Sequence, residues 1–423
     1  MIAPDRQKAP AFIKPTIFKL PPLEAKTLSN GIPYFEVLTG VQDAVKVEFI
    51  FNAGLLYEPE TGLAFFTAKL LSSGTAKLSA ASIEEKLASY GAFLELNAGH
   101  DHAGITVYCL AKFLKEILLV IKQLLTEALF PEEELENLKQ IQLQTLKVNA
   151  EKTAYLASTG FKKKFFLSGH PYSRSLTEES ILKIDRNALS AFYATAYGLN
   201  NCTIFISGGG ADSFFDTFDA IFGIHKISSK VFPAGLQAKL GSGTFHIEKG
   251  NALQSSLRIG LPALALDDPD YYKISFLNEV FGGYFGSRLM KNIREDKGYT
   301  YGIHSSLIAL LKASYMVIGT DVKKAVLEQT LEEIFKEAKI LKESLIGNDE
   351  METVKNYMIG GFLNSINTPF ALMEKFKVIY FHALPVRFFE THYTQIENIS
   401  PEEVLATAHA FLKEEAFEII TAG

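Results

Sequence analysis

The feature that most constrains the fold is an order of predicted elements that occurs twice along the chain. In the first half, Val45, Val47 and Phe49 alternate with charged residues, which predicts a half-buried strand. Helices and strands are predicted to follow at residues 61–72, 80–90, 93–98, 104–110, 111–128, 131–167, 178–196 and 203–207. The second half repeats this order at residues 255–261, 271–281, 287–295, 298–306, 312–319, 322–344, 348–366, 400–413 and 417–421. Two copies of an α+β unit of about 200 residues therefore explain the chain better than one large domain.

Glycine and proline mark the boundary between the two units. Gly208–Gly210 opens a linker-like stretch that contains Pro233 and further Gly and Ser residues. No Lys-Ser/Thr pair follows these glycines at phosphate-loop spacing, so we interpret them as a turn. We therefore expect an N-terminal domain at residues 1–210, a linker at 211–243 and a C-terminal domain at 244–423.

The composition argues against several classes of protein. The 423 residues are 48% hydrophobic and 21% charged, and the formal net charge is −6. Such a balance is typical of globular proteins and disfavours nucleic-acid binding, which needs a clustered basic surface. The most apolar run, 113–125, is interrupted by charges and is too short to cross a bilayer, and the start of the chain shows no secretory signal. We expect neither a nucleic-acid nor a membrane partner and a cytoplasmic location, with a periplasmic one less favoured.

The helix predicted at 61–72 has the spacing of a zinc motif without its chemistry. Phe65, Ala68 and Lys69 stand at i, i+3 and i+4 and share one helix face. In the inverted zinc motif H-x-x-E-H these positions carry a ligand, a general base and a second ligand. The spacing alone leaves open whether this is an ordinary buried helix or a metal site that has lost its ligands.

The segment from Arg294 to Tyr301 is the sharpest candidate for a binding site. It is predicted to leave a helix through Gly298 and to enter a strand, so both side chains can face one cleft. An arginine fork can hold a carbonyl or carboxylate, and a tyrosine hydroxyl can donate to a developing oxyanion. The alternative is a surface helix end with a half-buried aromatic residue.

The histidines give weaker signals. His100 and His102 share one strand face in an exposed strand or turn, but no third ligand lies nearby, so a metal site is the less favoured interpretation. His170 precedes Pro171 and Tyr172 and is interpreted as part of a packed turn. No G-x-S-x-G nucleophile motif occurs.

Taken together, these motifs resemble the pitrilysin/insulinase family of inverted-motif zinc metallopeptidases, in the bacterial form with two-domain subunits. The resemblance covers essentially the whole chain. It rests on Gly62-Leu-Ala-Phe-Phe-Thr-Ala-Lys69 with Gly74-Thr75, Gly91-Ala92 with Asn97-Ala98, His170-Pro-Tyr172, Ser287-Arg-Leu289, Ile293-Arg-Glu295 and Gly298-Tyr-Thr-Tyr-Gly302. It implies two homologous α+β domains, each a mostly antiparallel sheet packed with helices, that form a clam-like subunit.

The same resemblance implies that this chain has lost the family's zinc site. Phe65 and Lys69 stand where the family places two histidine ligands, and Ala68 stands where it places the general-base glutamate. The position of the third ligand falls near Thr145. We therefore expect no catalytic residue, metal or cofactor in this chain.

The resemblance also gives Arg294 and Tyr301 a role. In two-subunit members, the catalytic chain carries the zinc motif, and its partner carries an Arg/Tyr pair at this separation that reaches the substrate. This chain resembles that partner, which implies zinc in a homologous partner subunit and a peptide as the substrate. The family binds peptide as an added strand at a sheet edge, in the segment that matches Asn97 and Ala98.

The expected function is that of a non-catalytic, substrate-binding subunit of a heterodimeric zinc metalloendopeptidase that cleaves unfolded peptides. One alternative is a structural or assembly protein of the same fold, against which the retained Arg294 and Tyr301 weigh. The other is a stand-alone peptide-binding protein, which would bind peptides without a stable partner.

Overall fold

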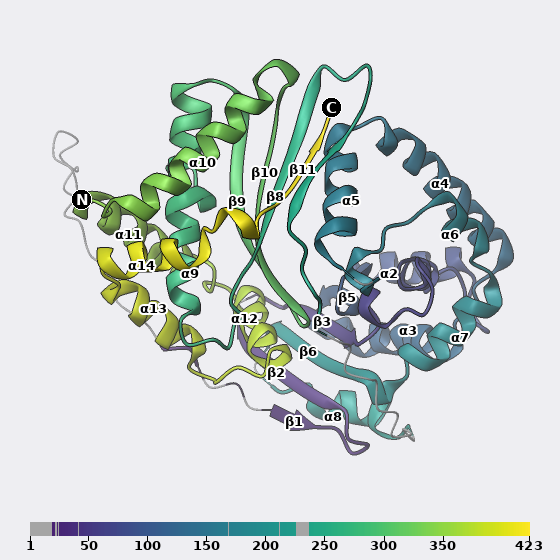
Figure 1. The fold of residues 1–423 in the computed structure, drawn as a ribbon. Helices are drawn as coiled ribbons and strands as arrows, with labels where there is room; N and C mark the ends of the chain where they lie inside the picture. Colours follow the sequence, from purple (N-terminus) through teal and green to yellow (C-terminus); the bar gives the residue numbers. More distant parts are fainter. Residues whose placement is uncertain are drawn as a thin grey trace, which may run out of the picture.

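Two β-sheets with the same strand order organise the chain (Figure 1). The structure is a computed structural model that describes residues 19–21, 23, 25–40, 42–167, 169–210, 212–225 and 237–423. The first sheet has the order β1–β2–β6–β3–β5–β4, and the second has the order β7–β11–β8–β10–β9. Without β1 the two sheets correspond strand for strand. In each, the parallel pair is formed by the unit's first and last strands (β2 with β6, β7 with β11), and every other neighbouring pair is antiparallel. The predicted pair of mostly antiparallel α+β units is confirmed.

The strands are β1 (Ala25–Thr27), β2 (Pro33–Gly40), β3 (Ala44–Phe51), β4 (Phe93–Ala98), β5 (Ala103–Leu110), β6 (Cys202–Gly209), β7 (Gly243–Ile247), β8 (Gln254–Pro262), β9 (Thr300–Leu310), β10 (Ala313–Lys323) and β11 (Glu418–Ala422). The α-helices are α1 (Leu63–Leu70), α2 (Ala80–Ser89), α3 (Leu114–Glu127), α4 (Glu132–Ala150), α5 (Thr153–Phe165), α6 (Glu178–Lys183), α7 (Arg186–Ala196), α8 (Phe215–Phe218), α9 (Tyr271–Asn278), α10 (Leu327–Glu343), α11 (Asn348–Asn364), α12 (Pro369–Phe381), α13 (Phe388–Asn398) and α14 (Pro401–Phe411). Among the described residues, π-helices span Asp219–Gly223, Glu279–Gly283 and Met290–Asp296.

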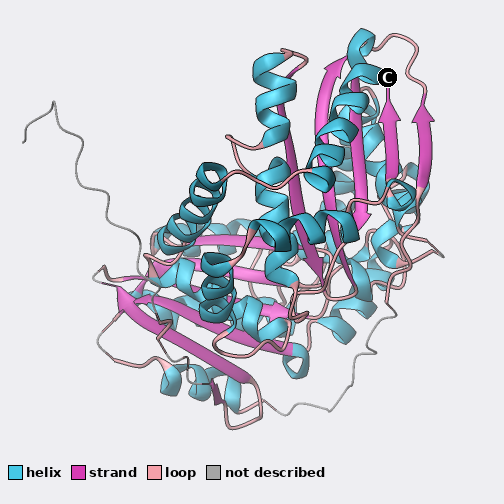
Figure 2. Cartoon of the chain, turned by 60° about the vertical axis from the view of Figure 1, so that its left-hand side comes forward, coloured by secondary structure: helices cyan, strands magenta, loops and turns pink. Residues whose placement is uncertain are grey.

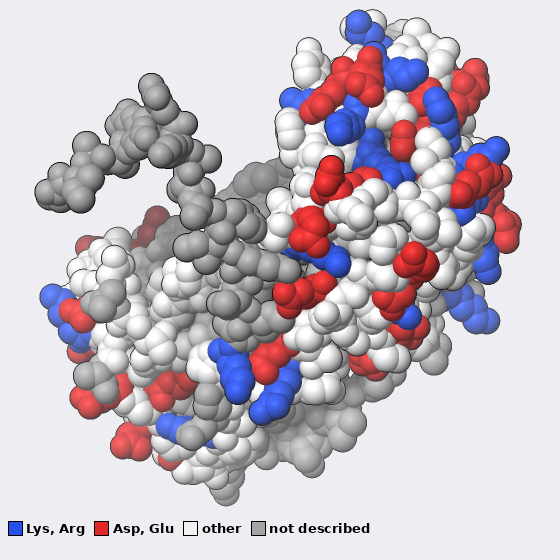
Figure 3. Space-filling model, turned by 90° about the vertical axis from the view of Figure 1, so that its left-hand side faces the viewer, with Lys and Arg blue, Asp and Glu red and all other residues white. Residues whose placement is uncertain are grey.

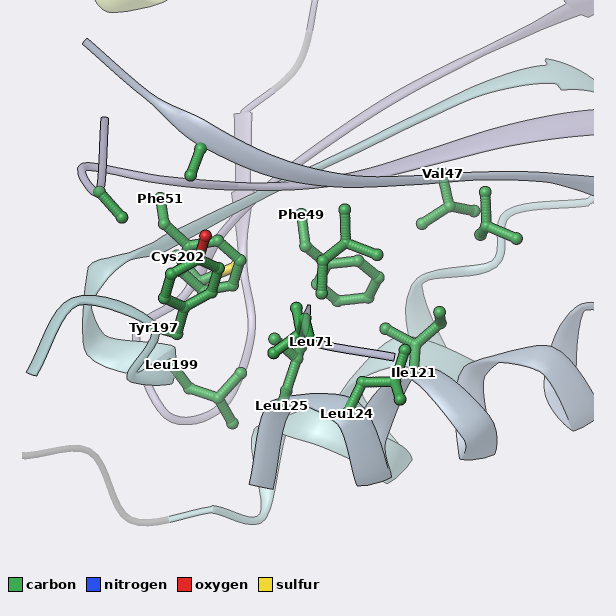
Figure 4. Close-up of a cluster of buried hydrophobic side chains, with 14 of the residues drawn as sticks. Val47, Phe49, Phe51, Leu71, Ile121, Leu124, Leu125, Tyr197, Leu199 and Cys202 are labelled. Atoms are coloured by element: carbon green, nitrogen blue, oxygen red, sulfur yellow. The ribbon is translucent and has the colours of Figure 1, made fainter. Parts of the chain in front are cut away.

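One face of each sheet is covered by helices of its own half. In β3, Val47, Phe49 and Phe51 have no exposed surface and belong to one apolar cluster. Figure 4 shows Val47 and Phe49 pointing from the strand toward Leu71 and α3, and Phe51 lying beside Tyr197, Leu199 and Cys202. Apolar residues recur at every second position of the strands and with a period of about 3.6 in the helices, so they lie on the sides that face each other. The sequence pattern predicts this layer.

The opposite face of each sheet is covered by a helix of the other half. The second-half helix α12 places Met373 and Phe376 in one buried cluster with Phe35 and Phe205 of the first sheet. Conversely, Phe161 of the first-half helix α5 shares a buried cluster with residues of the second sheet. Figure 1 shows α5 beside β8 and β11, and Figure 2 shows the two sheets as separate layers running in different directions. The two halves are therefore interlocked by an exchange of helices.

A ring of four charges fastens α12 to the first sheet. The ammonium nitrogen of Lys46 lies 3.0 Å from Oε1 of Glu48 and 2.7 Å from Oε1 of Glu374. The ammonium nitrogen of Lys377 lies 2.6 Å from the same oxygen of Glu48 and 2.8 Å from that of Glu374. Because Lys46 and Glu48 are buried, each charge is compensated by two of the opposite sign rather than by water.

Some element boundaries differ from the prediction. The helix predicted at 131–167 is divided between α4 and α5 at Glu151–Lys152, and the one predicted at 178–196 is divided between α6 and α7. Asp185 accepts from the amide of Ala188 to start α7, whereas α5 begins after Lys152 without a side-chain cap. The short helix predicted at 287–295 is mostly a π-helix. Helices α12 and α13 and strands β1 and β7 were not predicted.

Part of the stretch expected as a linker belongs to the first core. Within 211–243, α8 and the π-helix after it contribute Phe218, Ile221 and Phe222 to the same cluster as β3. Residues 226–236 of that stretch and residues 1–18 lie outside the described residues. In the described part of the chain, no helix combines the length and the apolar character that crossing a membrane requires.

Candidate functional site

Helix α1, which has the zinc-motif spacing, is fixed by a buried carboxyl group at its start. Oε2 of Glu58 accepts from the amides of Gly62 and Ala64 at 3.1 and 3.0 Å. Gly62 has a φ of 104°, a left-handed conformation that favours glycine. Burial raises the pKa of Glu58 to about 7, although the two amides and Arg174 oppose that shift. Sequence reasoning missed Glu58, since a carboxyl group in a loop before a helix gives no distinctive pattern.

The residues on the zinc-motif face of α1 do not fit a zinc site. Phe65 is half-buried with its ring 5.4 Å from that of Phe66, Ala68 is buried, and Lys69 is exposed. Thr145 lies exposed on α4, and its hydroxyl donates to the carbonyl of Ile141 in the same helix at 2.8 Å. A phenyl ring, a methyl group and an ammonium group offer no electron pair to a dication at neutral pH. The chemistry of this face therefore does not support zinc binding.

Strand β4 presents a free edge beside this helix. It ends the first sheet and pairs only with β5 among the described strands, with Asn97 opposite Gly104 and Ala98 opposite Ala103. Asn97 is exposed, and Ala98 is half-buried. An unpaired edge exposes backbone donors and acceptors that an extended peptide can use.

Arg294 lies in the π-helix Met290–Asp296, which is anchored on both sides. Met290 and Ile293 are buried in the second core. The amide of Asn292 donates from Nδ2 to Oε2 of Glu333 and Oε1 of Glu337 on α10, at 2.8 and 2.7 Å. The guanidinium carbon of Arg294 lies 4.7 Å from the centre of the Phe285 ring. π-Helical turns recur at functional sites, and this one holds Arg294 against an aromatic ring.

Tyr301 follows where β9 begins. Gly298, with a φ of 64°, turns the chain out of the π-helix, and the amide of Tyr299 donates to the carbonyl of Ile293 at 3.0 Å. Tyr301 is 94% exposed. Arg294 and Tyr301 thus lie at the two ends of one tight connection, and the tyrosine is fully open to a ligand.

A groove of about 670 Å³ runs beside the same π-helix but includes neither residue. Its lining mixes both charge signs and consists of Tyr284, Gly286, Arg288, Lys291, Asn292, Asp296, Glu337, Asp349, Glu350 and Thr353. Figure 3 likewise shows positive and negative side chains interleaved over this side of the molecule. The acidic side chains outnumber the basic ones, and Arg288 is paired with Glu350, so the groove shows no cluster of positive charge for an anionic ligand.

The histidines near 100 lie at the junction of the two halves rather than at an exposed turn. A carboxylate oxygen of Asp101 accepts from the amide of Leu311 at 3.0 Å, and the other accepts from the hydroxyl of Tyr172. The His102 ring lies 4.1 Å from that of Phe381 on α12, and its burial lowers the pKa of His102 to about 4. Among the described residues, no three His, Cys, Asp or Glu side chains are grouped as metal ligands. The expectation of an exposed turn was wrong, because the tip of the β4–β5 hairpin is covered by the second half.

The turn at His170 agrees with its predicted structural role. His170 and Tyr172 are buried, and Nδ1 of His170 accepts from the amide of Tyr172 at 3.3 Å. Tyr172 also contacts Asp101, so this turn supports the junction between the halves.

Comparison with known proteins agrees with this architecture. The Insulinase (Peptidase family M16) model matches residues 38–168, and the Peptidase M16 inactive domain model matches residues 183–358. An uncharacterized zinc protease, YmxG of Bacillus subtilis, is 23% identical over 82% of this chain and 86% of its own length. A non-peptidase homolog, YmxG of Helicobacter pylori, is 24% identical over 86% of this chain and 85% of its own length.

A solved structure has the same fold. The crystal structure of a peptidase M16 inactive domain from Pseudomonas fluorescens superposes with a TM-score of 0.83 and 24% identity, and it covers 95% of this chain and 98% of its own. Together, the two family models span most of the chain. This protein therefore belongs to peptidase family M16, the insulinase family, as a homologue of its inactive members.

Proposed function

We propose that this chain is the non-catalytic, substrate-binding subunit of a heterodimeric zinc metalloendopeptidase that cleaves unfolded peptides. The observation that carries the proposal is the contrast between two places in the fold. The zinc-motif face has no ligand chemistry at Phe65, Ala68 and Lys69. In contrast, Arg294 lies half-buried on the anchored π-helix against the Phe285 ring, and Tyr301 at the start of β9 is 94% exposed. In this proposal a homologous partner subunit supplies the zinc and the general base.

Arg294 and Tyr301 would act on the substrate through hydrogen bonds. The guanidinium group can donate to a peptide carbonyl, and the phenol can donate to the oxygen on which negative charge develops during cleavage. Since such a donor contributes most in the transition state, its removal should lower kcat more than it raises KM. The cytoplasmic location expected from the sequence stays a prediction.

The test is to mix the purified chain with the homologous subunit that carries an intact H-x-x-E-H motif in the same genome. We expect chelator-sensitive cleavage of unfolded peptides by the mixture and none by this chain alone. Arg294→Ala and Tyr301→Phe should each lower kcat by about 10²-fold, the loss typical of an oxyanion donor. Arg387→Ala, which removes an exposed arginine elsewhere, serves as the control. Cleavage by this chain alone, or a full-strength mixture with both substitutions, would overturn the proposal.

A stand-alone peptide-binding protein is a second candidate because of the free edge of β4. Strand addition at Asn97 and Ala98 would need only this chain. Tight binding of an extended peptide by the isolated chain, lost when proline replaces Asn97 or Ala98, would favour this candidate. The same experiment without binding would leave the heterodimer as the better explanation.

A further inference from the structure

Arg294 differs from the other arginines that the structure describes. Four of them donate hydrogen bonds to carbonyl, hydroxyl or carboxylate oxygens: Arg174, Arg186, Arg258 and Arg288. Arg387 lies 3.9 Å from a carboxylate oxygen of Glu390. Within the described residues, Arg294 has neither a hydrogen bond nor an ion pair, and its guanidinium group lies over the ring of Phe285. None of its N–H donors therefore has a hydrogen-bond partner among the described residues.

Phe285 is 64% exposed, and its ring lies against the guanidinium group of Arg294. It lies in a tight turn in which the amide of Ser287 donates to the carbonyl of Tyr284 at 3.1 Å. Exposed single apolar residues are common, but an exposed aromatic ring that covers a free guanidinium group is a specific arrangement.

Both ends of this turn are anchored to α11. The ring of Tyr284 lies 4.8 Å from that of Tyr357, and Arg288 forms two hydrogen bonds with the carboxylate of Glu350, at 2.9 and 2.8 Å. Gly286 leaves room for the Tyr284 ring, which a side chain at that position would meet at 2.8 Å. The turn thus holds Phe285 at a fixed place on the second half.

Arg294 reaches the ring from a separate anchor, the π-helix that is bound to α10 through Asn292. A guanidinium group that stacks parallel to an aromatic ring covers one of its faces and uses none of its in-plane N–H donors. In an arginine that is held by a carboxylate, those N–H donors would form hydrogen bonds with the carboxylate instead. Stacking is therefore a way to restrain the side chain while its hydrogen-bonding edge stays free.

We propose that Phe285 is a positioning residue that holds the Arg294 guanidinium group by its face, so that its N–H donors meet a backbone carbonyl of the bound peptide. The inference rests on the proposed function, in which Arg294 contacts the substrate. It adds a residue that acts through Arg294 and does not itself need to contact the peptide. Ordering the side chain in advance lowers the entropy lost when the peptide binds.

The proposed stack of Phe285 on the Arg294 guanidinium group is tested by nuclear magnetic resonance of the arginine side chains in this chain alone. The Nε–H signal of Arg294, assigned by its loss in Arg294→Ala, should show restricted motion in the wild type and in Phe285→Trp. It should become mobile in Phe285→Leu, which keeps an apolar side chain without the aromatic face. An equally ordered signal in Phe285→Leu would overturn the inference.

Its role toward substrate is tested in the complex with the zinc-bearing subunit by a double-mutant cycle. Phe285→Leu should lower kcat/KM about two- to fivefold, as expected for an exposed cation–π contact, and Phe285→Trp should restore it. In the Arg294→Ala background Phe285→Leu should have no further effect, because Phe285 acts through that arginine. Phe245→Leu, which removes the ring 3.9 Å from the Lys164 ammonium group, is the matched control and should leave kcat/KM unchanged.

The outcomes separate the two proposals. An additive loss in the double variant would overturn the positioning role and indicate that Phe285 contacts the peptide directly. If Arg294→Ala leaves cleavage unchanged, the proposed function fails and the substrate role of the stack fails with it. The side-chain measurement then still supports or overturns the stack itself.

Discussion

Ala383 ends α12 in a backbone conformation that favours glycine. Its φ is 51°, and the amides of Ala383 and Leu384 donate to the carbonyls of Tyr380 and Ile379 in the pattern of a Schellman cap. A non-glycine residue in this region costs roughly 1–2 kcal/mol. The cap therefore holds a small strain at the junction between α12 and the rest of the second half.

We expect Ala383→Gly to relieve this strain. Part of the gain is offset by the greater chain entropy of glycine in the unfolded state, so the free energy of unfolding should rise by about 0.5–1 kcal/mol. Urea unfolding followed by circular dichroism measures it. Ala191→Gly on the exposed side of α7 is the control, and it should lower stability by about 1 kcal/mol. An equal decrease in the free energy of unfolding in Ala383→Gly and Ala191→Gly would contradict a strained cap at Ala383.

His102 makes the junction between the halves sensitive to acid. Burial holds its pKa at about 4, with a smaller downward influence of His382 and Lys377 and an upward one of Asp101. Its Nε2 atom is buried and has no hydrogen-bond partner among the described residues. The folded state therefore favours the neutral ring, while the unfolded chain protonates near pH 6.5. The stability that this group contributes is present above pH 6.5 and is lost as the pH falls toward 4.

We expect the free energy of unfolding to fall between pH 6.5 and 4.5. In His102→Phe, which keeps a flat apolar ring against Phe381, the fall should be smaller. Urea unfolding at each pH gives both curves. The same slope in the wild type and the variant would show that His102 stays uncharged or solvated in both states.

Glu58 should have the opposite dependence on pH. Since burial raises its pKa to about 7, the folded state favours the protonated form. The associated stability is present below about pH 4.5 and is lost as the pH rises through 7. Glu58→Gln keeps an acceptor for the amides of Gly62 and Ala64 without the charge. We expect its stability relative to the wild type to rise between pH 5 and 8, measured by urea unfolding, and a constant difference would contradict a buried titrating group.

At the scale of elements, the sequence correctly predicted the helices and strands whose formation depends on residues close in sequence. The strand predicted from alternating apolar residues (β3) and the helix predicted from its Ser400 N-cap (α14) are both confirmed by the structure. Side-chain periodicity and capping depend on residues that are close in sequence. Helices α12 and α13 were missed. The hydrophobic residues of α12 do not form a simple amphipathic stripe, because Lys377 lies among apolar neighbours and is compensated by Glu48 from the other half. That partner is 329 residues away in sequence.

In the candidate site, too, the sequence indicated the residues that are close in sequence but not those brought together by tertiary contacts. Arg294 and Tyr301 could be singled out by their spacing, because both lie on one short connection, and their role toward a ligand stays a prediction. Phe285 could not, since its relation to Arg294 depends on anchors to α11 and α10 that are set by tertiary contacts. The covered position of His102 likewise depends on α12, which belongs to the other half.

The contact between α5 and the second sheet is close enough to require glycine. A Cβ atom at Gly260 of β8 would lie 2.4 Å from the Phe161 ring, and one at Gly160 of α5 would lie 2.5 Å from the Ile247 side chain. Both glycines let helix and sheet approach, although each weakens its own element.

We expect Gly260→Ala to lower the free energy of unfolding by about 1–3 kcal/mol, because the added methyl group overlaps a buried ring. Gly361→Ala is the matched control. Gly361 is an exposed helical glycine of α11 with nothing within 4 Å of an added Cβ, so alanine should stabilise by about 0.5–1 kcal/mol. Urea unfolding of both variants measures the contrast. A neutral Gly260→Ala would show that α5 can move away from the sheet without cost.

At the scale of the whole molecule, the exchange of helices removes the usual independence of two domains. Domains joined by a linker share a small polar interface and can unfold separately. Here Phe376 of α12 lies in the core under the first sheet, and Phe161 of α5 lies in the core under the second. If either helix detaches, a buried layer in the opposite half is exposed. The ring of Lys46, Glu48, Glu374 and Lys377 adds a penalty, because opening it would leave buried charges unpaired.

The two halves should therefore unfold together. Phe376→Ala and Phe161→Ala should each cost about 3–5 kcal/mol, as for a buried phenylalanine, and each should lower the stability of both sheets equally. Hydrogen exchange read by mass spectrometry measures this, through the slowest amides of β3 and β6 in one sheet and of β8 and β10 in the other. Phe93→Ala, at an exposed ring of β4, should leave both sets unchanged. Faster exchange in only the first sheet for Phe376→Ala, or in only the second for Phe161→Ala, would mean that the halves are separate folding units. Coupled loss in both sheets would mean that the chain presents Arg294 and the β4 edge on one cooperative body, so that access for a peptide depends on movement relative to a partner chain rather than on opening within this one.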